Sequence, residues 1–305
     1  MDVGFGLPVS GAWATPANQV RIARRAEALG YRSLWTFQRL LIPGQPEGIA
    51  ASPAYRSVLD PVVSLAHVAA VTERIRLGVA VLNMPFLSPA LAAKQLASVD
   101  VLSGGRLDAG FGLGWSPDEY AASGVRPERR GARGEEFLTV LRTLWTQEVA
   151  EHHGRFYDLP PVRSEPKPVQ RPHPPILLGG SAEPALDRAG RLADGWISSS
   201  RADPATLHVS IATVAAAARE AGRDPATLRY IARVPVRPGP GGQTGRQPLS
   251  GSLEEIRADL DELAGQGLTE LFIDLNWNPE VGGPDADPAA AMALAEATLE
   301  ALAPA

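Results

Sequence analysis

Short apolar runs of strand length alternate along the chain with longer segments whose apolar residues recur at helical spacing. The runs predict strands at residues 3–7, 33–36, 75–82, 106–111, 175–178, 196–198, 230–236 and 269–275. Helices are predicted between them at 15–29, 60–73, 88–102, 130–145, 183–192 and 203–221, then from 252 and from 287. Helix starts are marked by a capping residue followed by proline, as in Asp60-Pro61 and Ser88-Pro89, or by the Ser252/Glu255 capping box.

Eight strand–helix units with right-handed crossovers predict a (β/α)8 TIM barrel. An open doubly wound sheet is the alternative, although it usually has fewer units or a second domain. No linker divides the sequence, so we expect one domain over residues 1–305. Residues 147–174 fit neither period and are interpreted as an insertion. Residues 238–251 hold five glycines and three prolines, which predicts a mobile loop.

Composition narrows the classes of function. The chain has 29 Lys+Arg against 34 Asp+Glu, a net charge of −5, which argues against nucleic-acid binding. No apolar run approaches the roughly 20 residues that span a bilayer, and no signal peptide is recognised. Cysteine is absent and the five histidines lack ligand spacing, so no metal site is expected. A cytoplasmic location is the expectation.

In such a barrel the reactive residues lie where strands end at their carboxyl side and in the loops that follow. Residues 179–182, Gly-Gly-Ser-Ala, come at the start of a predicted helix, where free amides and the helix dipole favour an anion such as phosphate. Arg201, one strand later, adds positive charge. A capped turn that binds no anion is an alternative interpretation of residues 179–182 with equal weight. The glycine-rich run 110–114 lacks full dinucleotide spacing and is a weak signal.

Several motifs together identify a family. The sequence resembles the bacterial luciferase-like monooxygenase superfamily over roughly residues 1–237. Its motifs are most similar to those of the branch that uses the deazaflavin coenzyme F420. The matching motifs are TERIRLG at 72–78, KQLA at 94–97, SGGR at 103–106, GFGLGW at 110–115, PKPVQRP at 166–172, PPILLGG at 174–180 and ADGW at 193–196.

The resemblance implies a flavin or deazaflavin lying across the carboxyl-end mouth of the barrel. The implied cofactor is F420, with FMN as the alternative. The implied cofactor contacts are a cis peptide at Ala80-Val81 behind the ring, Asn83 at its polar edge, Gly112 and Gly114 beneath it, and Gly180, Ser181, Ala182, Ser199 and Arg201 around the phosphate. Similar proteins pair as homodimers, here through helices 60–73 and 89–102.

The sequence departs from the family after the second strand. F420-dependent relatives commonly carry Trp-x-x-Asp-His, but residues 35–39 read Trp-Thr-Phe-Gln-Arg, so Gln38 replaces the acid and Arg39 the histidine. Gln38 exchanges no proton at neutral pH and Arg39 stays charged. Arg39 is interpreted either as stabilising an anion of the reduced ring or substrate, or as pairing with a neighbouring carboxylate.

Other residues are candidates for acid–base work and for substrate contact. Glu119, with Asp118 and Tyr120 beside it, is a candidate proton donor, although a loop carboxylate is more often solvated. Trp13, Phe37 and Trp115 are expected to line an apolar substrate pocket.

Three functions are compatible with these residues. The first is an F420-dependent oxidoreductase that transfers hydride between the deazaflavin C5 and a small organic substrate. The second is an FMN-dependent luciferase-like monooxygenase. The third is a barrel without catalysis that serves as a partner subunit, because the usual acid–histidine pair is missing.

Overall fold

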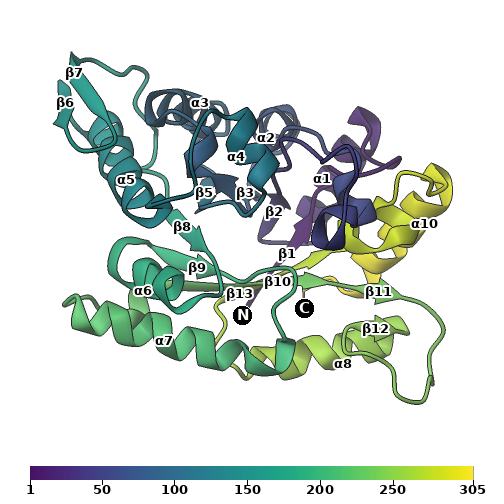
Figure 1. Cartoon of the computed structure of the whole chain (residues 1–305). Helices are drawn as coiled ribbons and strands as arrows, with labels where there is room; N and C mark the ends of the chain where they lie inside the picture. Colours follow the sequence, from purple (N-terminus) through teal and green to yellow (C-terminus); the bar gives the residue numbers. More distant parts are fainter. Residues whose placement is uncertain (305) are drawn as a thin grey trace.

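Eight parallel strands close into a barrel in the computed structural model, which describes residues 1–304 (Figure 1). The strands are β1 (Asp2–Gly6), β2 (Ser33–Thr36), β3 (Arg76–Val79), β5 (Leu107–Gly112), β8 (Ile176–Gly179), β9 (Gly195–Ile197), β10 (Arg229–Pro235) and β13 (Glu270–Asp274). Their order around the barrel is β3-β2-β1-β13-β10-β9-β8-β5, and β5 pairs back to β3 with Leu107 opposite Leu77. The predicted TIM barrel is confirmed.

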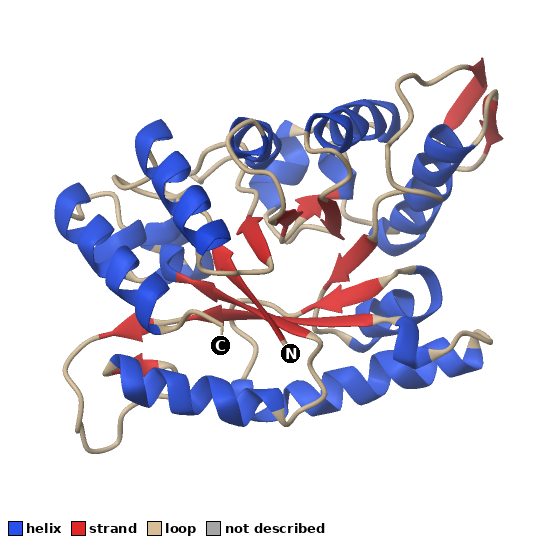
Figure 2. Ribbon diagram, turned by 180° about the vertical axis from the view of Figure 1, so that it is seen from behind, coloured by secondary structure: helices blue, strands red, loops and turns tan. Residues whose placement is uncertain are grey.

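Helices surround this sheet on its outer side (Figure 2). The main ones are α1 (Pro16–Ala28), α2 (Pro61–Ala69), α3 (Pro89–Leu102), α5 (Arg130–Thr146), α6 (Glu183–Leu192), α7 (Leu207–Glu220), α8 (Leu253–Ala264) and α10 (Pro288–Ala301). Their starts follow the sequence signals: the Asp60 side chain accepts from the amides of Val62 and Val63, and Ser252 and Glu255 form the capping box.

The structure differs from the sequence prediction at four places. The expected strand 75–82 is interrupted after Val79, and β4 (Leu82–Asn83) continues it on the far side of a break. The helix expected over 60–73 ends at Ala69. Two short helices, α4 (Pro117–Ala122) and α9 (Pro279–Gly282), stand where only loops were predicted. Periodicity does not detect helices of four to six residues, because they span fewer than two turns.

The insertion and the glycine-rich loop both contain short strands that pair. Residues 147–174 contain an antiparallel hairpin, β6 (Ala150–His153) and β7 (Asp158–Val162), which projects from the barrel (Figure 1). Loop 238–251 is held by pairing of β11 (Arg237–Pro238) with β12 (Ser250–Gly251), and by Arg246 against Asp259 at 2.6 Å. Its mobility stays a prediction.

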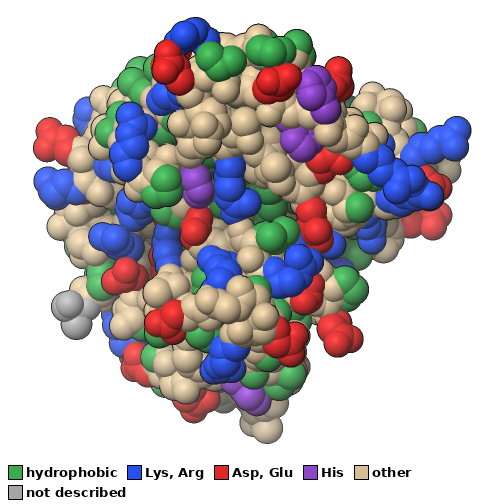
Figure 3. Space-filling model, turned by 90° about the vertical axis from the view of Figure 1, so that its left-hand side faces the viewer, with side chains coloured by type: hydrophobic (Ala, Val, Ile, Leu, Met, Phe, Trp, Pro, Cys, Tyr) green, Lys and Arg blue, Asp and Glu red, His purple; other side chains and the backbone are tan. Residues whose placement is uncertain are grey.

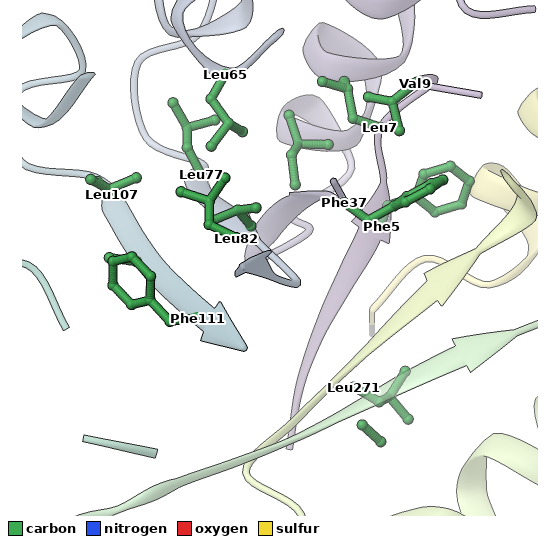
Figure 4. Packing of buried hydrophobic residues seen from close by; sticks show 14 of the residues in the cluster. Phe5, Leu7, Val9, Phe37, Leu65, Leu77, Leu82, Leu107, Phe111 and Leu271 are labelled. Atoms are coloured by element: carbon green, nitrogen blue, oxygen red, sulfur yellow. The ribbon is translucent and has the colours of Figure 1, made fainter. Parts of the chain in front are cut away.

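The apolar core has two compartments. The larger lies between strands and helices, where Leu65 of α2 and Leu77 of β3 lie close to each other (Figure 4). The smaller fills the barrel, where Trp35 and Phe272 stack with their ring centroids 5.0 Å apart. Gly78 makes room for this stack, since a Cβ there would lie 2.4 Å from the Trp35 ring.

Charged side chains close the barrel at the amino ends of its strands. Asp108 is fully buried and lies 2.6 Å from Arg76 and 2.7 Å from Arg229, which also reaches Glu270 at 2.7 Å. Glu270 accepts in addition from the Ser33 hydroxyl at 2.5 Å. Burial opposes ionisation of Asp108, but Arg229 and Arg76 outweigh it and lower the pKa of this carboxyl. Asp108, Arg76, Arg229 and Glu270 thus each have an oppositely charged partner.

The surface carries charges of both signs. On the face shown in Figure 3, basic and acidic side chains are interspersed, and hydrophobic side chains lie singly or in small groups. Over residues 1–304, no helix combines the length and the apolar character that crossing a bilayer demands.

Candidate functional site

A cleft of about 400 Å³ opens at the carboxyl ends of the barrel strands. This is the end where barrel enzymes carry their active sites. The sequence-predicted residues that line it are Phe37, Gln38, Arg39, Ala80, Val81, Asn83, Gly112, Gly114, Trp115, Gly180, Ser181, Ala182, Ser199 and Arg201. Trp13 and Glu119 are absent from the lining.

Trp13 was wrongly predicted as a substrate contact. Its side chain is completely buried in the main apolar core. The loop after β1 turns back toward α1 at this point, where the Trp13 carbonyl accepts from the Asn18 side chain at 2.8 Å. An aromatic residue near the barrel rim is therefore directed inward here, beneath the loop rather than into the cleft.

The break between β3 and β4 forms one wall of the cleft. The Ala80-Val81 peptide is cis, as the sequence resemblance implied. Val81 packs against Gly112 and Gly179, and a Cβ on Gly112 would lie only 2.6 Å from the Val81 Cγ2 atom. The Ala80 carbonyl accepts from Arg233 at 3.1 Å. Gly112 thus lines the cleft and also gives Val81 its space.

Gln38 and Asn83 join the ends of β2 and β4. The Gln38 side-chain carbonyl accepts from the backbone amide of Asn83 at 2.9 Å and from its side-chain amide at 3.1 Å. This fixes the orientation of Gln38 and leaves its NH2 group as the donor end. Gln38 is therefore a neutral hydrogen-bond donor held in the cleft.

Arg39 occupies a cage of aromatic rings beside the cleft. Its side chain is only 5% exposed, and its Nη1 lies 3.1 Å from Glu119 Oε2. The guanidinium carbon lies 4.3 Å from the Tyr55 ring centroid and 4.5 Å from that of Trp115, both cation–π distances. Pairing with a carboxylate, one of the two sequence interpretations, is therefore present, while the same guanidinium still lines the cleft.

Glu119 differs from the solvated loop carboxylate that the sequence suggested. It is 1% exposed, lies within α4, and accepts from the amides of Leu40 at 2.7 Å and Leu41 at 3.1 Å. Because it does not line the cleft, direct proton transfer to a ligand there is not supported. Its contacts instead fix the start of the loop after β2 and the position of Arg39.

Sequence reasoning missed several residues of the cleft, among them Arg130, Arg233 and Tyr55. Arg233 of β10 is 8% exposed at its side chain, contacts Asp274 at 2.6 Å and lies 4.7 Å from the Phe37 ring centroid. An arginine within an otherwise apolar strand was the available signal. Tyr55 lies in a short 3-10 turn (Pro53–Tyr55) of the loop after β2, and no sequence pattern marks it. Burial raises the pKa of Tyr55, although Arg233 and Arg39 oppose this, so its phenol stays protonated at neutral pH.

The opposite side of the cleft is built by the start of α6. Helix α6 has no side-chain cap at its Ala182 N-cap position, and the amides of Ser181, Ala182 and Glu183 find no acceptor within residues 1–304. Trp196 fixes the turn by donating to the Gly180 carbonyl at 2.8 Å. Free amides at a helix start, with Arg201 nearby in the lining, favour an anion.

Residues 3–270 match the family model of luciferase-like monooxygenases. The chain belongs to this family. Among its relatives, an uncharacterized Mycobacterium tuberculosis protein is 40% identical over 210 residues, 66% of this chain and 73% of that protein. A Pseudomonas putida FMNH(2)-dependent dimethylsulfone monooxygenase is 41% identical over 138 residues, 44% of this chain and 38% of that enzyme.

Solved structures of this luciferase-like fold superpose on nearly the whole chain. The monooxygenase RslO1 from Streptomyces bottropensis has a TM-score of 0.79 at 24% identity, covering 99% of this chain and 98% of its own. An F420-dependent secondary alcohol dehydrogenase, solved with an F420–acetone adduct, has a TM-score of 0.78 at 16% identity with the same coverage. At these identities the superposition establishes the fold. An F420-dependent enzyme and a riboflavin lyase solved with modified FMN both have this fold.

Proposed function

We propose that this luciferase-like protein is an F420-dependent oxidoreductase that transfers a hydride between the deazaflavin C5 and a small organic substrate. The observation that carries the proposal is the charge of the cleft, because no carboxylate of residues 1–304 lines it. Arg39 and Arg233 in the lining are paired with Glu119 and Asp274 behind it, whereas Arg130 and Arg201 have no carboxylate partner within residues 1–304 and supply the excess positive charge. F420 carries a phosphate and further carboxylates on its tail, whereas FMN ends at one phosphate. The excess positive charge fits the more anionic cofactor.

The residues present fit such a cofactor at both of its ends. The free amides of Ser181 and Ala182, with Ser199 and Arg201, would hold the phosphate. Val81 and Gly114 would contact the ring system, and Asn83 and Gln38 would face its polar edge. Each of these residues lines the same cleft, so one elongated ligand can reach all of them.

When bound, reduced F420 supplies the hydride; the protein provides orientation, electrostatics and exclusion of water. Arg39 is placed to stabilise negative charge on the hydride acceptor. Tyr55 keeps its proton at neutral pH and lines the cleft, so it is placed to hydrogen-bond the oxygen or nitrogen that takes up the electron pair. Glu119 then positions Arg39, in place of the proton transfer that the sequence suggested for it.

A second candidate is an FMN-dependent monooxygenase. The resemblance to dimethylsulfone monooxygenases favours it, since the Pseudomonas fluorescens enzyme is also 33% identical over 204 residues. That match covers 64% of this chain and 52% of the enzyme. Oxygen chemistry differs from hydride transfer in consuming O₂, which makes the two candidates separable by one measurement.

The deciding experiment equilibrates the purified protein with F420, FMN and FAD in turn and measures retention of each, then oxygen uptake and hydride exchange. Tight retention of F420 with hydride exchange at C5 is the expected result. Oxygen uptake with reduced FMN would establish the monooxygenase instead. Retention of none of the three would favour a partner subunit without catalysis.

We also propose that two copies of the chain pair through α2 and α3. Val63 of α2 is 68% exposed, and Leu91 and Leu102 of α3 are 50% and 67% exposed. Apolar side chains this exposed on neighbouring helices are better buried in an interface. Light scattering should give twice the chain mass, and Val63→Glu with Leu91→Glu should give a monomer; a monomeric wild type at micromolar concentration would contradict the pairing.

A further inference from the structure

Two clusters of positive charge stand on different sides of the cleft. Arg201 follows β9 and lies in the lining with the free amides at the start of α6. Arg39 follows β2, and the strand order places β2 four positions away from β9 in the ring of eight. The amides of Ser181 and Ala182 follow β8, three positions from β2, so an anion bound there would lie on a different side of the barrel mouth from Arg39.

The Arg39 guanidinium has unused hydrogen-bonding capacity. A guanidinium carries five N–H donors. Within residues 1–304 the Arg39 side chain makes no hydrogen bond; its Nε and Nη1 atoms are buried without an aligned acceptor, and Glu119 is its ionic partner. The Nη2 atom is neither among these buried atoms nor hydrogen-bonded within residues 1–304, and Arg39 lines the cleft. Nη2 is therefore the donor that a ligand oxygen in the cleft can reach.

Flat side chains surround this guanidinium. Tyr55 lies 6.0 Å from Trp115, 5.0 Å from Trp277 and 6.3 Å from Phe37, measured between ring centroids. Trp115 is 42% exposed, so part of this aromatic cluster faces the opening. Aromatic faces favour planar ligands, and a fixed cation among them favours a ligand with negative charge.

We propose that the substrate is a planar organic anion, a carboxylate or phenolate on a conjugated framework. Its oxygen is held by the Arg39 guanidinium, which packs between Tyr55 and Trp115. This assignment rests on the proposed function in so far as it names that reaction's substrate. The binding itself needs no cofactor, so the two can fail separately. A protein that turns over neither F420 nor FMN but binds such an anion at Arg39 refutes only the reaction.

The experiment compares benzoate with benzamide, which have nearly the same shape and differ in charge. Calorimetric titration is carried out in inorganic phosphate, which we expect to occupy the amides at the start of α6. We expect benzoate to bind at least tenfold more tightly than benzamide. Arg39→Gln should abolish that preference, and Arg39→Lys should keep part of it, because the charge stays but the planar fork is lost.

Two further variants keep the test specific. Arg56 is an exposed neighbour of Tyr55, and Arg56→Gln should leave the preference unchanged although it removes the same charge. Trp115→Leu should weaken benzoate and benzamide by equal factors, because it removes a stacking face and no charge. Thermal unfolding confirms that each variant is folded.

Three results would overturn the proposal. Equal affinity for benzoate and benzamide in the wild type would show that charge is not recognised. A preference that survives Arg39→Gln would place the recognition elsewhere. A preference lost in Arg201→Gln and retained in Arg39→Gln would show that benzoate occupies the phosphate position.

Discussion

The two ends of the barrel both bury arginines but treat them differently. At the amino ends of the strands, Asp108 lies between Arg76 and Arg229, and these three charges are matched by opposite partners. At the carboxyl ends, Arg39 has one carboxylate neighbour and no hydrogen bond within residues 1–304. Arg233, also at the carboxyl ends, is hydrogen-bonded to Asp274, so the contrast is between the Asp108 cluster and Arg39. A guanidinium that keeps a free donor in a cleft can still bind a ligand. The difference separates the stabilising end from the functional end of this barrel.

The largest effect is expected from a change at the amino ends of the strands, where Asp108 is paired. Asp108→Asn keeps the side-chain shape but leaves Arg76 and Arg229 without their shared carboxylate. Removing one partner of a buried ion pair costs about 3–5 kcal/mol, and we expect that loss in the free energy of unfolding measured with urea. Asp2→Asn is the matched control, since Asp2 forms an exposed pair with Arg32 at 3.4 Å, and it should cost less than about 1 kcal/mol.

Ligand binding by folded Asp108→Asn protein should equal that of the wild type. If the variant instead loses cofactor binding while keeping its stability, the assignment of roles to the two ends is reversed.

The next largest effect is expected from a change at the carboxyl ends of the strands, where Arg39 lies. Arg39→Ala should lower turnover about 10²-fold or more, because a preorganised charge beside the reacting group is lost. Its unfolding free energy should change less than that of Asp108→Asn, since Glu119 keeps its bonds to the amides of Leu40 and Leu41. Arg39→Lys should recover part of the rate. Steady-state kinetics and urea unfolding on the same samples make the comparison.

A loss of stability as large as that of Asp108→Asn, with an unchanged rate per folded molecule, would mean that Arg39 serves the fold alone.

Features that depend on residues close together in the sequence could be predicted, whereas contacts between residues far apart in the sequence could not. The strands, most helix starts and the Ala80-Val81 bond follow from local patterns and motifs. The Arg39–Glu119 pair joins positions 80 residues apart, one in the loop after β2 and the other in α4, and only the closed barrel brings them together. Tyr55 enters the cleft through a loop without periodicity. Trp13 was misplaced because a rim aromatic can face either the core or the cleft.

The third prediction tests the opposite side of the cleft from Arg39. Ser181→Asp places a carboxylate among the free amides at the start of α6, where the phosphate is proposed to bind. Cofactor affinity should fall at least about tenfold, which corresponds to roughly 1.4 kcal/mol. Ser181→Ala is the control and should weaken binding less, because it adds no charge. Equal affinity of Ser181→Asp and wild type in a cofactor titration would place the phosphate elsewhere.

The last and smallest effect concerns acid stability at the amino ends of the strands. The pKa of Asp108 is lowered in the folded state, because Arg229 and Arg76 outweigh the effect of burial. A group whose folded pKa is depressed stabilises the protein above its unfolded pKa, near 3.8, and that contribution is lost as the pH falls through the folded value. The Asp108 contribution should therefore be constant between pH 7 and pH 5 and decline below about pH 4. Urea unfolding across this range should show a shallower acid slope for Asp108→Asn than for the wild type, and identical slopes would show that Asp108 has no depressed pKa in the fold. Replacements in the cleft such as Ser181→Ala should leave the acid slope as it is, because they remove no carboxylate.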